Sequence, residues 1–252
     1  MSRKKNKTIG VCRLCCEPKE LIVQSHVISG FLLRQILNKE NKGFSTLKIQ
    51  DKKSRPVQDA AHEPDLLCEN CDQVILGSYE NYAKRLFFGE LKKKDELIEH
   101  VHDEYMEFQN IDYQKLKLFL LSLVWRASIS KKNSTFQLSN EMEDLLRTRL
   151  FSNSNVRDDE FPVFISSYLH SGVPKELILS PYIVEKNDGQ YFIFLAGGMH
   201  FIICLKDHKL CKSFPDFILK QNGSVKVREL NPNSIKRTIN HYLGINYFVV
   251  DQ

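Results

Sequence analysis

The sequence predicts an α+β protein, on three observations spread along its 252 residues. Two Cys-x-x-Cys pairs, Cys12–Cys15 and Cys68–Cys71, stand in the first third of the chain. An apolar run at helical spacing follows over residues 112–130. Alternating apolar residues broken by Asn-Asp-Gly and Gly-Gly turns over residues 181–205 indicate antiparallel strands. We therefore expect a cysteine-bearing N-terminal region, central helices and a C-terminal α+β region with antiparallel strands.

Short elements are expected around the cysteine pairs. Val and Ile over residues 20–28 predict a strand, and residues 29–40 predict an amphipathic helix with Ser29 as its N-cap. Residues 41–60 are polar and indicate an irregular stretch or a hairpin. After the second cysteine pair, a helix is expected over residues 72–91, with one apolar side made of Val74, Ile75, Tyr79, Tyr82 and Leu86.

Residues 96–152 are expected to be helical. The run over residues 112–130 is apolar nearly all round, which predicts a buried central helix. In it, Trp125 is expected in the core and Arg126 as a cation at the helix edge. Ser139, followed by acidic residues in the first turn, predicts the start of a further helix.

The C-terminal region changes to strand patterns. The strands over residues 181–205 are followed by a closing helix that is expected to end at Gly244. Cys204 and Cys211 lie in or near these strands, and buried thiols are the expected state for both.

Composition excludes some classes of protein. No apolar run approaches the roughly 20 residues that a membrane-spanning helix needs, and no apolar segment of a secretory signal follows the basic N-terminus. We therefore expect a cytoplasmic protein without a membrane partner. Thiols stay reduced there, which makes metal ligation or free thiols the expected state of the seven cysteines.

The net charge is +5, and the distribution of basic residues is uneven. Two basic clusters flank the cysteine motifs, and such clusters suit a polyanionic ligand because neutralising phosphates releases counterions. Solvated surface charge is the alternative interpretation. The clusters consist of Arg3, Lys4, Lys5, Lys7 and Arg13, and of Lys48, Lys52, Lys53 and Arg55.

The two cysteine pairs predict a structural zinc site. Cys12, Cys15, Cys68 and Cys71 supply four thiolates, the tetrahedral ligand set that Zn²⁺ prefers. A structural zinc contributes on the order of 10 kcal/mol to the folding of a small module. Cys16 is the open alternative to Cys15, although the two-residue gap is the commoner spacing.

The residues around His26 carry a resemblance to a known family. The motifs CRLC at 12–15, SHVIS at 25–29 and EPDLLCENCD at 63–72 occur in the order of the treble-clef unit of zinc-containing HNH, or ββα-metal, endonucleases. The first 95 residues more closely resemble a group of uncharacterised bacterial HNH-like proteins that are associated with defence against phage and mobile DNA. The resemblance implies a zinc-stapled HNH-like domain over residues 8–95. For residues 96–252 we expect a partner-binding or regulatory role.

The resemblance also implies roles for particular residues. His26 stands in the place of the general base that deprotonates the attacking water, and an imidazole with a pKa near 6.5 is available for this at cellular pH. Asp72 stands where the family has its final metal-binding histidine, and a carboxylate suits a catalytic Mg²⁺ or Mn²⁺. Glu63 stands in the place of the family asparagine and is expected at the catalytic site.

The chain departs from the family pattern at several positions. Ser25 replaces a metal ligand, and Ser29 replaces the usual proline. Glu63 is one replacement ligand, and Glu80 is another if the helix bends at Gly77. His62 and Asp65 are further candidates for that role.

Each of these residues also has a structural interpretation. His26 can hydrogen-bond within the module or act as a further zinc ligand. Asp72 can be a carboxylate favoured by the helix dipole, and Glu80 can be a solvated helix residue.

Two functions from different classes therefore follow from the sequence. The first is a metal-dependent HNH-type endonuclease that hydrolyses phosphodiester bonds, with DNA as the expected nucleic acid, as an effector in antiviral or mobile-element defence. A regulatory partner such as an ATPase or a sensor is expected with it. The second is a catalytically inactive zinc module that binds nucleic acid or protein.

Overall fold

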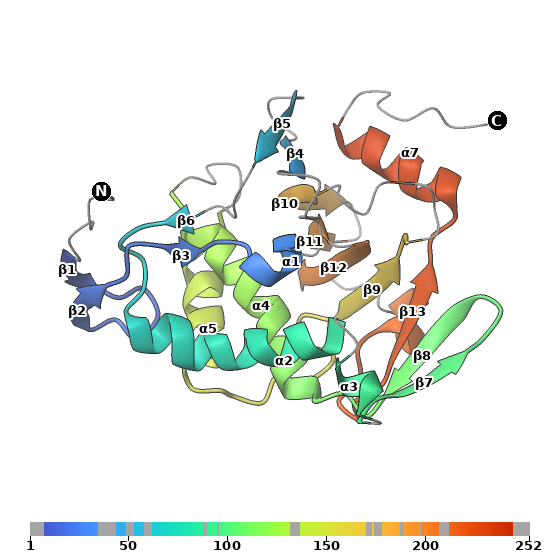
Figure 1. Cartoon of the computed structure of the whole chain (residues 1–252), viewed down its shortest axis with the longest axis horizontal. Helices are drawn as coiled ribbons and strands as arrows, with labels where there is room; N and C mark the ends of the chain where they lie inside the picture. Colours follow the sequence, from blue (N-terminus) through green and yellow to red (C-terminus); the bar gives the residue numbers. More distant parts are fainter. Residues whose placement is uncertain are drawn as a thin grey trace. The chain divides into compact units, whose positions relative to one another are not determined.

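The computed structural model describes residues 8–34, 44–48, 53–57, 62–87, 90–94, 96–131, 137–169, 173, 178–186, 189–196, 198–206 and 212–243. The fold is mixed α+β, as the sequence predicts (Figure 1). The chain forms two compact units, each assembled from separate stretches of sequence. The first unit comprises residues 1–30, 60–90 and 114–156, and the second comprises 31–59, 91–113 and 157–252. Residues 114–156 thus belong to the same compact unit as both cysteine pairs.

The first unit opens with two small antiparallel pairs of strands. Strand β1 (Thr8–Val11) pairs with β2 (Pro18–Leu21), so that Val11 lies opposite Pro18. Strand β3 (Ser25–His26) pairs with β6 (His62–Glu63), so that Ser25 lies opposite Glu63. The first ladder brings together the residues on either side of the first cysteine pair, and the second brings residues that follow the first pair next to residues that precede the second.

The single strand predicted over residues 20–28 is wrong, because the chain is diverted between β2 and β3. The backbone N–H of Ile22 donates to the carbonyl of Leu67 at 2.9 Å, and the N–H of Asp65 donates to the carbonyl of Ile22 at 3.2 Å. These long-range hydrogen bonds satisfy Ile22 outside either strand pair. Local β-propensity could not reveal them.

The helix predicted after the second cysteine pair is present, but its first turns are π-helical. The π-helix η1 (Asn70–Leu76) continues into α2 (Gly77–Phe87), and the Gly77 N–H donates to the carbonyl of Asp72, five residues back. This wider turn changes the angular spacing of the side chains. Val74, predicted on the apolar side, is therefore 62% exposed. The residues that are buried on this helical stretch are Cys71, Leu76, Tyr79 and Ala83.

Helix α4 (Tyr113–Ile129) is the buried central helix that the sequence predicts. It contains no Gly or Pro, and its leucines and aromatic residues, which point in all directions around the helix axis, are buried. The hydroxyl of the buried Ser122 donates to the carbonyl of Phe119 at 2.6 Å, which satisfies this polar group within the helix. Ring contact between Phe87 and Phe119 packs α2 against α4.

Helix α5 (Asn140–Phe151) follows and begins at the predicted cap. The Ser139 hydroxyl accepts a hydrogen bond from the Met142 N–H, which satisfies one of the free donors of the first turn. Leu146 and Leu150 are buried. The Tyr79 hydroxyl donates to the Leu150 carbonyl at 3.0 Å and so joins α2 to α5.

The second unit contains a nine-stranded sheet with the order β5-β4-β10-β11-β12-β9-β13-β8-β7. Its pairings are antiparallel except for β4 with β10 and β9 with β13. The strands are β4 (Phe44–Lys48), β5 (Lys53–Val57), β7 (Ile98–Val101), β8 (Tyr105–Gln109), β9 (Val163–Ser167), β10 (Ile178–Lys186), β11 (Gly189–Ala196), β12 (Met199–Lys206) and β13 (Val225–Glu229). The hairpin predicted within residues 41–60 is confirmed as β4–β5. The consecutive strands predicted over residues 181–205 are confirmed as β10, β11 and β12.

The helical assignment of residues 96–112 is wrong. This stretch forms the antiparallel hairpin β7–β8, and β8 pairs with β13, more than a hundred residues later. Its four Glu residues favour a helix, but such propensities differ by less than about 1 kcal/mol per residue. Pairing with a distant strand therefore outweighs the local preference.

One face of this sheet carries a hydrophobic core. Tyr191, Ile193 and Leu195 alternate along β11 and pack with Ile235 and Ile239 of α7 (Pro232–Leu243). Cys204 lies in the same core, which confirms the predicted buried thiol. Gly244 and Cys211 lie outside the described residues. The short helices α1 (Gly30–Arg34), α3 (Glu90–Lys93) and η2 (Pro215–Phe217) complete the described elements.

Candidate metal centre and histidine site

The four predicted zinc ligands lie together in the first unit. The Sγ atoms of Cys12, Cys15, Cys68 and Cys71 are all within 4.8 Å of one another. Zn–S bonds of about 2.3 Å place the sulfurs of a tetrahedral site roughly 3.8 Å apart, so the cluster is compact enough for one zinc ion. Cys16 is exposed and does not belong to the cluster.

Backbone hydrogen bonds shape the turn that carries the first cysteine pair. The Cys16 N–H donates to the carbonyl of Cys12 at 2.9 Å, and Cys16 takes a positive φ of 60°. The Arg13 N–H donates to the carbonyl of Leu66, two residues before the second pair. The Cys68 N–H donates to the Sγ of Cys12 at 3.3 Å. The turn and the start of η1 are thus joined through the backbone as well as through the thiols.

The thiols in this cluster have different acidities. Burial acts to raise the pKa of Cys12, but hydrogen bonds from the amides of Cys15, Cys68 and Leu14 outweigh it and lower the pKa. Burial raises the pKa of Cys71, and the neighbouring Cys68 thiol and the charge of Cys12 raise it further. A cation that binds among the sulfurs would stabilise every thiolate and so lower the pKa of each coordinating thiol. The donor set is therefore suited to a divalent metal.

Helix α5 supports the first cysteine pair from outside the sequence motif. Arg13 forms an ion pair with Glu143 at 2.9 Å, and Arg147 donates from Nη1 to the carbonyl of Leu14 at 3.2 Å. Glu143 also accepts from the hydroxyl of Ser128 on α4 at 2.7 Å. The sequence motif gave no indication of this support, because the partners are more than a hundred residues apart.

His26, the predicted general base, lies half-buried at the end of β3. Ser25 is 1% exposed, and its hydroxyl has no hydrogen-bond partner among the described residues. Opposite Ser25 on β6, Glu63 is 3% exposed. Its carboxylate accepts from the Ser130 hydroxyl at 2.6 Å and from the Lys131 N–H at 3.0 Å. Glu63 therefore binds the two residues that follow α4 with both of its oxygens.

Asp72 and Glu80 lie near a buried guanidinium. Arg126 is 2% exposed, so the prediction of a cation at the helix edge is wrong. It forms an ion pair with Glu80, and the same carboxylate oxygen accepts from the Ser29 hydroxyl at 2.9 Å. Glu80 is therefore an internally bonded carboxylate. Burial raises the pKa of Asp72, while the nearby Arg126 lowers it and Glu80 raises it.

The predicted acidic ligands do not form a second metal cluster with His26 in the described part of the chain. The only group of three or more metal-binding side chains close together there is the set of four cysteines. Asp65 is exposed and has a positive φ of 62°. Its carboxylate accepts a hydrogen bond from the Thr8 hydroxyl. The side chain of His62 lies outside the described residues.

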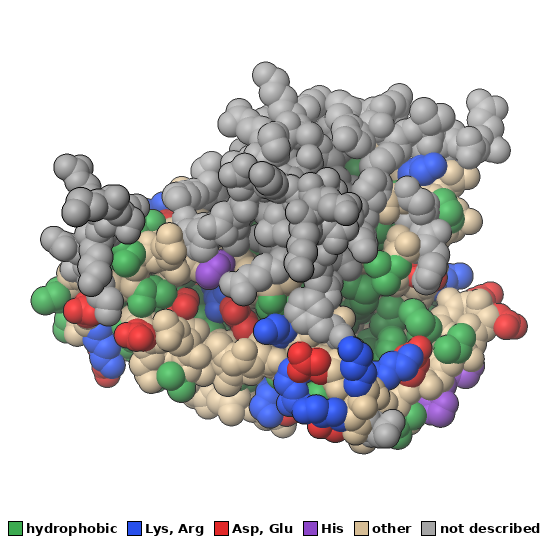
Figure 2. Space-filling model, in the orientation of Figure 1, with side chains coloured by type: hydrophobic (Ala, Val, Ile, Leu, Met, Phe, Trp, Pro, Cys, Tyr) green, Lys and Arg blue, Asp and Glu red, His purple; other side chains and the backbone are tan. Residues whose placement is uncertain are grey.

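Few of the predicted nucleic-acid-binding residues can be placed. Arg13 is paired with Glu143. Lys48, Lys53 and Arg55 lie on β4 and β5, but their side chains, like the whole of Lys52, lie outside the description. Basic side chains do gather over the C-terminal end of α2 (Figure 2), where Lys84 and Arg85 form the last turn. The two consecutive basic residues in the sequence were the signal that could have predicted this basic surface.

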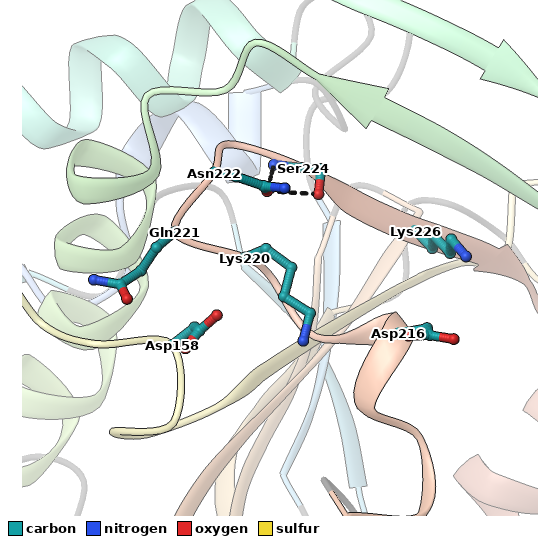
Figure 3. Close-up of a pocket in the computed structure, with 7 residues that line it drawn as sticks. All are labelled: Asp158, Asp216, Lys220, Gln221, Asn222, Ser224 and Lys226. Carbon is teal, nitrogen blue, oxygen red and sulfur yellow. Dashed lines mark hydrogen bonds between the residues drawn. The ribbon is translucent and has the colours of Figure 1, made fainter.

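A separate polar pocket of about 370 Å³ lies in the second unit (Figure 3). Asp158 and Asp216 stand on either side of Lys220, and Asn222 accepts two hydrogen bonds from Ser224. The other lining residues are Gln221 and Lys226. The lining has no thiol or imidazole, so this pocket does not hold the predicted chemistry.

Comparisons of the chain with known protein families, with curated proteins and with solved structures give no match. Within the part of the chain that the structure describes, none of the helices has the length and apolar character that a membrane crossing requires.

Proposed function

We propose that the chain is a metal-dependent endonuclease of the HNH type that hydrolyses phosphodiester bonds of DNA, with a structural zinc held by the four cysteines. One observation carries the proposal. Strands β3 and β6 pair, and the helix that begins at Asn70 follows them, with His26 on the first strand and Asp72 in the first helical turn. This order supports the proposal because it is similar to the order of elements in a ββα-metal unit on a treble-clef zinc module.

The proposed reaction is hydrolysis by an activated water. The imidazole of His26 accepts a proton from water, the water oxygen attacks phosphorus, and the bond from phosphorus to the 3′ oxygen breaks. The leaving oxygen takes its proton from solvent. A general base of this kind contributes about 10²–10⁴-fold to the rate.

The residues present fit a divalent ion of the Mg²⁺ type in part. Mg²⁺ is usually bound through one or two carboxylates together with water and substrate phosphates. Asp72 supplies one such oxygen donor, whereas Glu80 is paired with Arg126. When bound at Asp72, Mg²⁺ or Mn²⁺ would neutralise charge on the scissile phosphate. We include in the proposal a role in defence against phage or mobile DNA, under control of a partner protein.

A specific observation favours a second function, a zinc-stapled binding module without catalysis. Two of the acidic residues expected at the catalytic site are engaged internally, Glu63 by Ser130 and Lys131, and Glu80 by Arg126 and Ser29. Such a module would still present the basic end of α2 to nucleic acid.

A cleavage assay separates the two functions. The purified full chain is incubated with plasmid DNA and Mg²⁺ or Mn²⁺, beside His26→Ala and, as a matched control, His100→Ala from the exposed part of β7. The nuclease proposal expects nicking or cutting by the wild type and by His100→Ala, and at least about 100-fold less by His26→Ala. If all three bind DNA equally and none cuts it, the chain is a binding module.

A further inference from the structure

We propose that Arg126 is a positioning residue for His26, which fixes the backbone of the predicted base from inside the fold. The inference rests on the proposed function only for the role of His26. Arg126 lies on α4, a hundred residues after His26, and donates from Nη1 to the His26 carbonyl oxygen at 3.3 Å. No sequence motif joins these two residues.

The Arg126–Glu80 ion pair holds the chain after His26 at two points. Arg126 holds the carbonyl of His26, and Glu80 accepts from the hydroxyl of Ser29, three residues later. The two partners are joined to each other by their own ion pair. The segment from His26 to Ser29 is thus held by a single ion pair, whose partners lie on α4 (Arg126) and on α2 (Glu80).

The strand that carries His26 is too short to fix its own orientation. Strands β3 and β6 have two residues each, and the ladder contains only the pairs Ser25–Glu63 and His26–His62. Strands in globular proteins usually have about five or six residues, and an isolated pair of strands even of that length is at best marginally stable in water. Contacts outside the ladder must therefore decide where the His26 side chain lies.

The chemistry of Arg126 suits positioning better than stabilisation. Its Nε is buried and has no hydrogen-bond partner among the described residues, so the desolvation of this donor is not compensated. Buried ion pairs seldom stabilise more than apolar residues of the same volume. A guanidinium can, however, reach two acceptors with fixed geometry, which an ammonium cannot do equally well.

Arg126 does not contact substrate in this arrangement, because the side chain is almost completely buried. Its effect on hydrolysis is therefore expected in the rate of the chemical step and not in the binding of DNA. A misplacement of about 1 Å in a catalytic group can lower the rate about 100-fold.

The test compares Arg126→Met, Arg126→Lys and Ser29→Ala with matched controls on α4. Lys117→Met removes another buried cation, about 13 Å away along the helix axis. Ser122→Ala removes another buried hydroxyl whose hydrogen bond is local to the helix. Zinc content is measured in every variant to confirm that the cysteine module is intact.

The first readout is the backbone carbonyl signal of His26 in protein labelled with ¹³C on its eight histidines, assigned by its loss in His26→Gln. We expect this signal to move in Arg126→Lys and in Ser29→Ala and to stay in place in Ser122→Ala. If Arg126→Met fails to fold, these milder variants still decide. An unmoved His26 signal in folded Arg126→Lys overturns the proposal.

The second readout is kinetic. We expect kcat to fall at least about 30-fold in Arg126→Met with KM changed less than about threefold, and Arg126→Lys to recover part of the loss. Equal loss in Lys117→Met would show a general effect of helix stability and would overturn the proposal. If the wild type cuts no DNA, the proposed function fails, whereas the carbonyl signal still tests Arg126.

Discussion

Arg13, which lies between Cys12 and Cys15, is joined to Glu143 of α5 by an ion pair of 2.9 Å. Glu143 uses its other carboxylate oxygen to accept from Ser128 of α4. One side chain thus links the turn of the first cysteine pair to two helices. The folding of the cysteine module and that of the helices in the first unit should therefore be coupled.

We predict that Glu143→Ala lowers the free energy of unfolding by about 1–2 kcal/mol, because it removes a partly exposed ion pair and a hydrogen bond to a charged acceptor. Denaturant unfolding followed by circular dichroism measures the change. Asp144→Ala is the control, since its ion pair with Arg147 lies at the surface and is expected to contribute under about 0.5 kcal/mol. Equal effects of the two substitutions would contradict the coupling.

Removal of zinc should unfold the first unit. A structural zinc site contributes on the order of 10 kcal/mol, so a strong chelator is expected to abolish cooperative unfolding of this unit. Cys71→Ser should lose bound zinc, because Cys71 belongs to the cluster of four thiols. Denaturant unfolding followed by circular dichroism measures the effect of the chelator, and metal analysis of the purified protein measures the zinc content of Cys71→Ser.

Cys16→Ser is the matched control for the zinc prediction, since Cys16 is exposed and lies outside the cluster. We expect about one zinc per chain in the wild type and in Cys16→Ser. Zinc retained by Cys71→Ser and lost from Cys16→Ser would show that the ligand set is different.

The second unit should lose stability in mild acid through His200. Burial lowers the pKa of this histidine from 6.5 to about 4. Below pH 6.5 the unfolded chain therefore binds a proton at His200 that the folded chain does not bind. This contribution to the free energy of unfolding is present above pH 6.5 and is lost as the pH falls towards 4. At about 1.4 kcal/mol per pH unit, the loss between pH 6.5 and 5 is about 2 kcal/mol.

Denaturant midpoints at these two pH values measure the acid sensitivity of the second unit. His200→Leu should remove this part of the pH dependence, whereas the exposed His100→Gln should leave it unchanged. An unchanged pH dependence in folded His200→Leu would assign the acid sensitivity to other groups.

Gly223→Ala should destabilise the second unit by at least about 2 kcal/mol. Gly223 has a φ of +79°, and a Cβ there would lie 2.5 Å from the carbonyl oxygen of Ile111. The Gly223 carbonyl also accepts from the Ile111 N–H at 2.9 Å, so the two segments cannot easily move apart. Thermal unfolding measures the effect.

Gly77→Ala provides the matched glycine substitution. Gly77 has helical angles, with a φ of −59°, and an added Cβ would make an ordinary contact of 3.4 Å with the Asp72 carbonyl. Alanine is better than glycine by up to about 1 kcal/mol in a helix, so this variant should be as stable as the wild type or more stable. Loss of stability in Gly77→Ala comparable with that in Gly223→Ala would contradict the argument from backbone angles.

Local signals were sufficient for several elements. The cap at Ser139, the apolar run of α4 and the hairpins of β10 to β12 each depend on residues close together in the sequence, and all three are confirmed. The spacing of the cysteines likewise predicted a cluster that the structure shows. The nuclease activity, its metal and its DNA substrate stay predictions.

The sequence by itself determined which residues could ligate zinc, which helix would be buried and where the antiparallel strands would lie, because side-chain chemistry and periodicity act over a few residues. Only the tertiary structure decided that residues 98–109 pair as strands, that η1 winds as a π-helix and that Arg126 is buried against His26 and Glu80. The strand pairing and the contacts of Arg126 depend on partners that lie from 46 to more than a hundred residues away. Such contacts have no local signature, since burial and pairing are properties of the assembled fold.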